Sequence, residues 1–238
     1  LNSDQIYSGK TTVWSGSLEV NGNLEQSAVS VYKEATVRGS GTFGAGLELY
    51  EKGILEVGPG KGQAGTIQIN DQLTCMDDAR ICFDLSDDSS GLVKANDLIS
   101  VEGNVDLGPS VILEVQLLDG SLQAGQYTLI EYSGTFTGDL SGMVCAGLDG
   151  VAYSLVNDGT SIILEITKLR DAGRITWKGD ASNDWDLAST LNWLYAGSPD
   201  WFVPRDTVLF NDEGNPNTSI NLTGSLYAGQ VLVDASID

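Results

Sequence analysis

The residues best suited to chemistry are carboxylates gathered in one stretch of the chain. Six aspartates lie between residues 77 and 97, namely Asp77, Asp78, Asp84, Asp87, Asp88 and Asp97. Calcium prefers several carboxylate and carbonyl oxygens, so Asp77, Asp78, Asp87 and Asp88 form a candidate calcium site. Because the regular D-x-D-x-D-G loop is absent, a solvated acidic loop is the competing interpretation. No other cofactor is expected.

Tryptophan supplies a second candidate chemistry, the stacking of aromatic rings on sugars. Four of the five tryptophans lie in the last third of the chain, at Trp177, Trp185, Trp193 and Trp201. If exposed, these rings would form a carbohydrate-binding face. If buried, they would be the packing anchors of a small C-terminal subdomain, because each ring covers a large apolar area.

Charge and residue types exclude several classes of function. The chain of 238 residues has no histidine, which excludes a Ser-His-Asp triad, a Cys-His pair and a His-ligated metal. Its 12 Lys and Arg against 33 Asp and Glu give a net charge of −21, which opposes binding to nucleic-acid phosphates. Its apolar runs are too short to cross a bilayer.

Degradation of polysaccharide is a further candidate activity. A glycosidase needs two carboxylates at a defined separation, and 33 acidic residues single out no pair. A lyase needs a Lys or Arg base beside calcium-binding carboxylates, whereas the basic residues of this chain are scattered. We therefore expect no catalytic residue in this chain.

The three cysteines leave two interpretations open. Cys75, Cys82 and Cys145 are odd in number and show no C-x-x-C spacing. They are buried small hydrophobic residues, or Cys75 and Cys82 form a disulfide.

Short β-strands must position all of these residues. The 29 glycines separate β-branched and aromatic runs, and apolar residues alternate with a period of two, as in Val111–Leu118. No stretch keeps the helical i, i+3, i+4, i+7 spacing for three turns. The sequence therefore predicts an all-β fold.

A repeat of 18 residues organises the first part of the chain. Trp14, Tyr32 and Tyr50 recur at this spacing after strand-like runs, and Ile67–Asn70 continues the series 20 residues further on. This period suits one turn of a parallel β-solenoid, whose stacked turns share a core. The three aromatics would form a ladder on the face opposite that core. The predicted inward positions are Val13, Val31, Leu49 and Ile69.

The corners of such a solenoid need special backbone conformations. Glycines in Gly39–Gly41 and Gly58–Gly60 would allow positive φ there. An antiparallel β-sandwich is the competing fold, but it does not explain the return of an aromatic residue at fixed intervals.

The repeat also resembles a known family. Ile6–Gly22 is similar to the N-x-Y-x-G-x-T-x-V-x-x-G-x-L-x-V run of the autotransporter-associated β-strand repeat. The series Ile175–Gly179, Trp185–Asp186, Asn192–Trp193 and Asp206–Asp212 resembles the W-x-G…W-D…N-W…D-x-V-x-F block that opens a further array of such repeats. The resemblance implies a right-handed β-helix in an exported bacterial surface protein, without family-wide catalytic residues.

Two domains are expected, a β-helical repeat domain over residues 1–168 and a Trp-rich β segment over residues 169–238. The expected function is that of a non-catalytic, adhesin-like scaffold or stalk within a larger secreted or surface-exposed bacterial protein. The alternatives are a carbohydrate-binding module and a non-catalytic fragment of a polysaccharide lyase or hydrolase. Polysaccharide or other cell-surface components are the expected partners, and we expect no membrane insertion of this segment.

Overall fold

The computed structural model describes residues 1–119, 122–148, 151–167, 170–214, 219–224 and 226–236. These residues form an all-β structure with one short 3-10 helix, η1 (Leu140–Gly142). They divide into two compact units, Leu1–Leu148 with Tyr153–Ile166, and the described residues after Ile166 with residues 151 and 152. The domain boundary predicted between residues 168 and 169 lies outside the described residues. None of the described helical segments has the length and apolar character needed to span a membrane.

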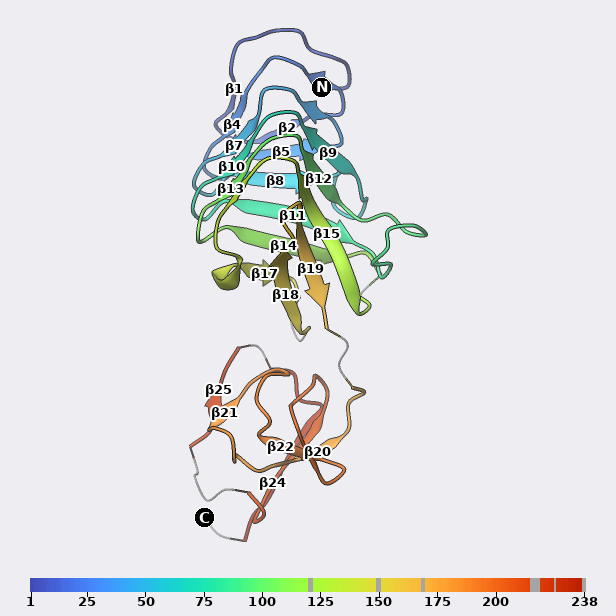
Figure 1. Cartoon of the computed structure of the whole chain (residues 1–238), viewed down its shortest axis with the longest axis vertical. Coiled ribbons are helices and arrows are strands. Elements are labelled where there is room, and N and C mark those ends of the chain that lie inside the picture. Colours follow the sequence, from blue (N-terminus) through green and yellow to red (C-terminus); the bar gives the residue numbers. More distant parts are fainter. Residues whose placement is uncertain (120–121, 149–150, 168–169, 215–218, 225, 237–238) are drawn as a thin grey trace. The chain divides into compact units, whose positions relative to one another are not determined.

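The first unit contains three sheets, which we call sheets I, II and III (Figure 1). Sheet I consists of β1 (Thr11–Val13), β4 (Val29–Val31), β7 (Leu47–Leu49), β10 (Leu73–Cys75), β13 (Val105–Leu107) and β16 (Phe136–Thr137). Sheet II consists of β2 (Ser17–Glu19), β5 (Thr36–Gly39), β8 (Ile54–Val57), β11 (Arg80–Leu85), β14 (Ile112–Leu117) and β17 (Val144–Ala146). Sheet III consists of β3 (Asn23–Leu24), β6 (Thr42–Phe43), β9 (Thr66–Ile69), β12 (Leu98–Val101), β15 (Gly125–Tyr132), β19 (Ser161–Ile166) and β18 (Tyr153–Asn157).

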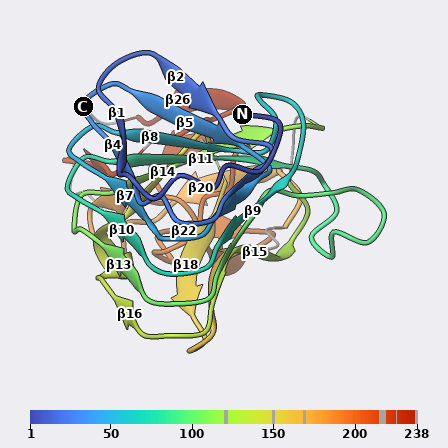
Figure 2. The ribbon, with the colours of Figure 1, turned by 90° about the horizontal axis from the view of Figure 1, so that it is seen from above.

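Successive strands of this unit visit the three sheets in turn, so strands adjacent in space are distant in sequence. Seen from above, the labels of sheet I follow one side, those of β2, β5, β8, β11 and β14 a second, and those of β9 and β15 a third (Figure 2). All neighbouring strands of sheets I and II are parallel. This pairing is not that of the antiparallel sandwich considered from the sequence.

The inner face of sheet I carries the predicted aliphatic ladder. Val13 is opposite Val31, and Val31 is opposite Leu49, which confirms the 18-residue register at these positions. Val31 and Leu49 are fully buried and Val13 is 8% exposed. Each added strand therefore covers apolar side chains of the strand before it, and the stacked strands share one core.

The fourth member of that ladder was predicted wrongly. Ile69 is buried, but it lies in sheet III opposite Phe43. The position after Leu49 belongs to Cys75, whose strand pairs with β7 in sheet I. The extra residues of the 58–65 loop lengthen this passage through the three sheets. Counting 20 residues from Leu49 therefore reaches sheet III, before the chain has returned to sheet I at β10.

Glycine meets a steric requirement at two corners of the unit. Gly39 has a φ of 132°, and a side chain there would collide with the carbonyl oxygen of Val20. Gly58 has a φ of 83° and lies against the carbonyl oxygen of Gln63. These positions agree with the corners predicted from glycine, since an L-residue with a β-carbon rarely adopts such φ values.

Sheet III ends differently from the other two. Its last strands, β19 and β18, pair antiparallel, β19 with β15 and β18 with β19. Ile162 and Leu164 of β19 are fully buried. This antiparallel hairpin covers the edge of β15 that a further parallel strand would otherwise occupy.

The second unit is built on a five-stranded mixed sheet with a separate two-stranded pair. The larger sheet runs β23 (Ser198–Asp200), β22 (Trp193–Tyr195), β20 (Arg174–Trp177), β24 (Thr207–Asn211) and β26 (Gln230–Asp234). The pair is β21 (Asp184–Trp185) with β25 (Asn221–Leu222). Its core consists of Ile175, Trp177, Trp185, Trp193, Phe202 and Val208.

Candidate functional site

The four aspartates of the candidate calcium site lie at opposite ends of one strand. Asp77 and Asp78 precede β11, whereas Asp87 and Asp88 follow it. Strand β11 spans six residues, about 3.3 Å each, so the two pairs cannot share one ion. Across the described part of the chain, no three Cys, Asp or Glu side chains form a group that could hold a metal. The structure does not assemble the predicted calcium site.

Asp88 instead orders the loop between β11 and β12. Its carboxylate accepts hydrogen bonds from the hydroxyl of Ser90 at 2.6 Å and from the backbone N–H of Val93 at 2.7 Å and of Lys94 at 3.1 Å. These donors hold the pKa of Asp88 well below its usual range. Asp87 forms an ion pair with Lys94 at 2.6 Å. The acidic loop is thus tied by hydrogen bonds to its own backbone.

Asp84 and Asp97, the remaining aspartates of the cluster, fix the 58–65 loop between β8 and β9. Both are buried, with 5% and 1% of their surface exposed. Asp84 Oδ2 accepts from the backbone N–H of Gln63 at 3.0 Å, and Asp97 Oδ1 accepts from that of Gly65 at 2.6 Å. Asp97 Oδ2 also accepts from the backbone N–H of Asp84 at 2.6 Å. Desolvation by burial raises the pKa of Asp97 to about 8.

The tryptophans of the second unit are core residues. Trp177, Trp185 and Trp193 are only 4%, 8% and 1% exposed. Trp193 meets Trp177 edge-on at 4.9 Å between centroids and meets Trp185 at 5.2 Å. Their faces are covered by protein, so these three rings cannot stack on a sugar in this conformation. Trp201, at 36% exposed, lies outside this core cluster.

Two residues of the motif block, to which the sequence assigned no individual role, hold this unit together. Buried Asn192 donates to the carbonyl of Asp184 at 2.7 Å and accepts from the backbone N–H of Ser182 at 2.9 Å. Buried Asp206 accepts two hydrogen bonds from Arg170, at 2.8 and 2.9 Å. Their places in the N-W and D-x-V-x-F motifs were the available signal, and both residues have structural partners.

The aromatic ladder forms as predicted. The rings of Trp14 and Tyr32 stack at 4.1 Å between centroids, and those of Tyr32 and Tyr50 stack at 4.3 Å. Trp14, 68% exposed, and Tyr50 are the two ends of the ladder, and each has one ring face without an aromatic neighbour among the described residues. Met76 takes the next position. Its backbone N–H donates to the carbonyl of Leu49, and the backbone N–H of Tyr50 donates in the same way to the carbonyl of Val31. Because ring faces within the ladder cover one another, its role is packing.

The cysteines are free thiols, so the alternative of a disulfide between Cys75 and Cys82 is wrong. Cys75 points into the core from sheet I, whereas Cys82 lies on the outer face of sheet II. Burial raises the pKa of Cys82 and of Cys145 to about 12. Neither thiol is a ready nucleophile at neutral pH, because the thiolate is the reactive form.

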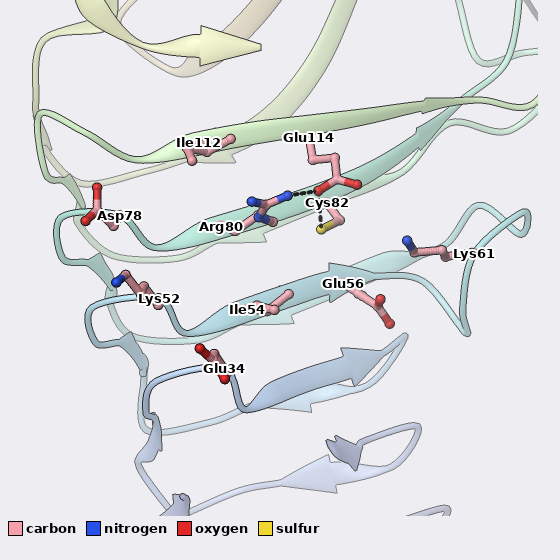
Figure 3. Close-up of a pocket in the computed structure, with 10 residues that line it drawn as sticks. All are labelled: Glu34, Lys52, Ile54, Glu56, Lys61, Asp78, Arg80, Cys82, Ile112 and Glu114. Atoms are coloured by element: carbon pink, nitrogen blue, oxygen red, sulfur yellow. Dashed lines mark hydrogen bonds and ion pairs between the residues drawn. The ribbon is translucent and has the colours of Figure 1, made fainter. Parts of the chain in front are cut away.

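A concavity with a volume of about 500 Å³ lies on the outer face of sheet II (Figure 3), and a second one, of about 570 Å³, lies on the outer face of sheet III around Gln68, Ser100 and Tyr132. We call the first of these the sheet II concavity. It is lined by Glu34, Lys52, Ile54, Glu56, Lys61, Asp78, Arg80, Cys82, Ile112 and Glu114. These residues come from β8, β11, β14, the corners that precede β5, β8 and β11, and the 58–65 loop. The concavity therefore combines residues in or beside four neighbouring strands of sheet II, β5, β8, β11 and β14.

The corner residues of this concavity share an unusual backbone conformation. Glu34, Lys52 and Asp78 each have a φ of 61°, in the left-handed region. Such values are uncommon for residues other than glycine. The three side chains line one rim, and Lys61 lies at the opposite rim on the 58–65 loop (Figure 3).

Some charges of the concavity are paired and others are open to a ligand. Arg80 forms an ion pair with Glu114, and Arg38, beside the concavity, pairs with Glu56 at 3.9 Å. Among the described residues, Lys61, Glu34 and Asp78 form no ion pair within 4 Å. The arrangement can donate and accept hydrogen bonds, but it holds no activated nucleophile.

Comparison with known proteins assigns the chain to no family. No protein-family model matches the chain, and no curated protein sequence matches it either.

Proposed function

We propose that this chain is a non-catalytic scaffold or stalk, a right-handed β-helical repeat segment of a large secreted or surface-exposed bacterial protein. The observation that carries the proposal is the in-register stacking of parallel strands in the first unit. Val13, Val31 and Leu49 succeed one another in one ladder, and Val37, Leu55 and Ile81 do so in sheet II. Stacking of this kind extends a protein in one dimension, because each rung contacts only its neighbours.

The charge distribution supports the same function. Glu19, Glu56 and Glu114 occupy equivalent outward positions of sheet II, and Glu48 does so in sheet I. Together with the other acidic residues, which give the whole chain a net charge of −21, these glutamates keep an elongated, edge-rich protein soluble and resist side-by-side association.

The second unit supports the prediction that a further repeat array opens there. Strand β24 pairs with β26 in parallel, with Val208 opposite Val231. Val231 and Val233 of β26 are 53% and 75% exposed. A further parallel strand on β26 would cover these side chains, as each strand of the first unit covers its neighbour.

The location is tested on bacterial cells that produce the protein. An antibody against the folded chain should label intact cells or the culture medium. Labelling that requires permeabilised cells would contradict a secreted or surface-exposed scaffold. A marker of known internal location provides the control for cell integrity.

The absence of catalysis is tested on a panel of polysaccharides. We expect neither release of reducing ends nor formation of the unsaturated products of a lyase. Turnover that disappears in Glu56→Gln or Glu114→Gln would overturn the scaffold proposal in favour of a polysaccharide-degrading enzyme. Gln68→Ala, on the outer face of sheet III, is the matched control.

A further inference from the structure

We infer that the sheet II concavity binds a neutral, hydroxyl-rich glycan chain laid across the strands. This site is separate from the tryptophans that suggested sugar binding in the sequence. Three of those rings are buried, whereas the concavity opens to solvent with about 500 Å³ of space. If no glycan binds, the scaffold proposal still stands, so the two proposals can be refuted separately.

The walls of the concavity are preformed. Its floor is the outer face of β8, β11 and β14, whose backbones are bonded to strands on both sides. The 58–65 loop, which carries Lys61, is fixed from beneath by the carboxylates of Asp84 and Asp97. A ligand therefore orders little of the protein when it binds, which lowers the entropic cost.

The polar chemistry of the walls fits hydroxyl groups. Lys52, Lys61 and Arg80 donate hydrogen bonds, and the four carboxylates of Glu34, Glu56, Asp78 and Glu114 accept them. A sugar hydroxyl both donates and accepts, so a wall of interleaved donors and acceptors suits vicinal hydroxyls. Because cationic and anionic side chains nearly balance here, a neutral ligand is favoured over an ion. The net charge of −21 also repels acidic polysaccharides.

The floor adds an apolar contact on either side of the charged centre. Ile54 and Ile112 flank Arg80 at equivalent outward positions of three adjacent strands. The two isoleucines are two strand spacings apart, about 10 Å. That separation lets each aliphatic side chain contact the C–H face of a different sugar ring along one chain.

A peptide fits this surface less well than a glycan. An extended peptide binds a sheet chiefly by adding a strand to an open edge through main-chain hydrogen bonds. The concavity lies on the face of sheet II, where β8, β11 and β14 already have strand partners on both sides. The ligand therefore meets side chains, whose donors and acceptors can bind sugar hydroxyls.

The test is titration of the whole chain with neutral cello-, manno- and chito-oligosaccharides of three to six sugars, followed by calorimetry. Binding of at least one series at millimolar or lower concentration is expected. The double variant Lys52→Ala/Lys61→Ala should lose about tenfold or more in affinity, since each lysine donates charged hydrogen bonds. Gln68→Ala on sheet III should bind as the unaltered chain does.

The inference is overturned if no neutral oligosaccharide binds, or if an oligogalacturonate binds more tightly than the neutral series. It is also overturned if the double variant binds normally while Trp201→Ala does not. Amide chemical shifts of the unaltered chain give a readout that is independent of variant folding. The perturbed amides should lie in β8, β11, β14 and the 58–65 loop, and a cluster elsewhere would contradict the site.

Discussion

Replacing Val31 by Asp is the most direct test of the register of the first unit. Val31 has no exposed surface in β4 and is held between Val13 of β1 and Leu49 of β7. Its removal from the core loses about 1.5–3 kcal/mol of apolar burial. The new carboxylate would face the aliphatic ladder without a partner, which adds several kcal/mol. Since whole domains are stable by about 5–15 kcal/mol, we expect the first unit to unfold or nearly so.

Two control variants separate burial from charge. Val31→Ala removes apolar contact without a charge and should cost about 1.5–3 kcal/mol. Thr12→Asp adds the same charge at an exposed position of the neighbouring strand and should change stability by about 0.5 kcal/mol or less. Urea unfolding followed by far-ultraviolet circular dichroism measures all three free energies.

The pH dependence of Val31→Asp gives an internal check. A carboxyl group buried without a partner has a raised pKa, because desolvation disfavours its charged form. The folded variant therefore binds a proton more tightly than its unfolded chain, and its deficit should shrink as the pH falls toward about 4. If Val31→Asp melts at the same temperature as the unaltered chain, Val31 does not face the core and the register is wrong.

Three further predictions concern single groups. Burial raises the pKa of Asp97 from 3.8 to about 8, so the folded chain binds the carboxyl proton more tightly than the unfolded chain does. The contribution of Asp97 to stability should therefore fall as the pH rises from 4 to 8. The melting temperature of Asp97→Asn should not show this decline with rising pH. If it declines in parallel with that of the unaltered chain, Asp97 is not the group responsible. Tyr32→Ala should cost about 1–3 kcal/mol by removing two ring contacts, whereas Tyr32→Phe should cost little; equal losses in urea unfolding would exclude stacking as the cause. Arg170→Ala should cost the second unit about 3–5 kcal/mol by stranding buried Asp206, and an unchanged melting curve of the near-ultraviolet tryptophan signal would contradict this.

Local repetition was readable in the sequence because it depends only on spacing. Trp14, Tyr32 and Tyr50 recur at 18 residues, and residues that repeat at one period fall opposite one another in stacked strands. The alternation of Glu and aliphatic residues likewise identified inner and outer positions. These patterns predicted the ladders in rungs of equal length.

The prediction failed where a loop changed the length of a rung. The 58–65 loop carried Ile69 into sheet III and left its predicted place to Cys75. The aspartates show a related difficulty, because proximity in sequence placed Asp77 and Asp87 together while β11 holds them apart. An extended strand separates its two ends by its own length, whatever the charge of the flanking residues.

The sequence by itself determined the β-structure, the repeat period and the classes of chemistry that the chain lacks, because composition and spacing fix these properties. Only the tertiary structure decided which side chains meet. Trp177 and Trp193 became core residues, since covering their rings removes apolar surface from water. Glu34 and Glu114, 80 positions apart in the numbering, came to line one concavity. Strand pairing across loops of unequal length created that neighbourhood, and no local pattern in the chain encodes it.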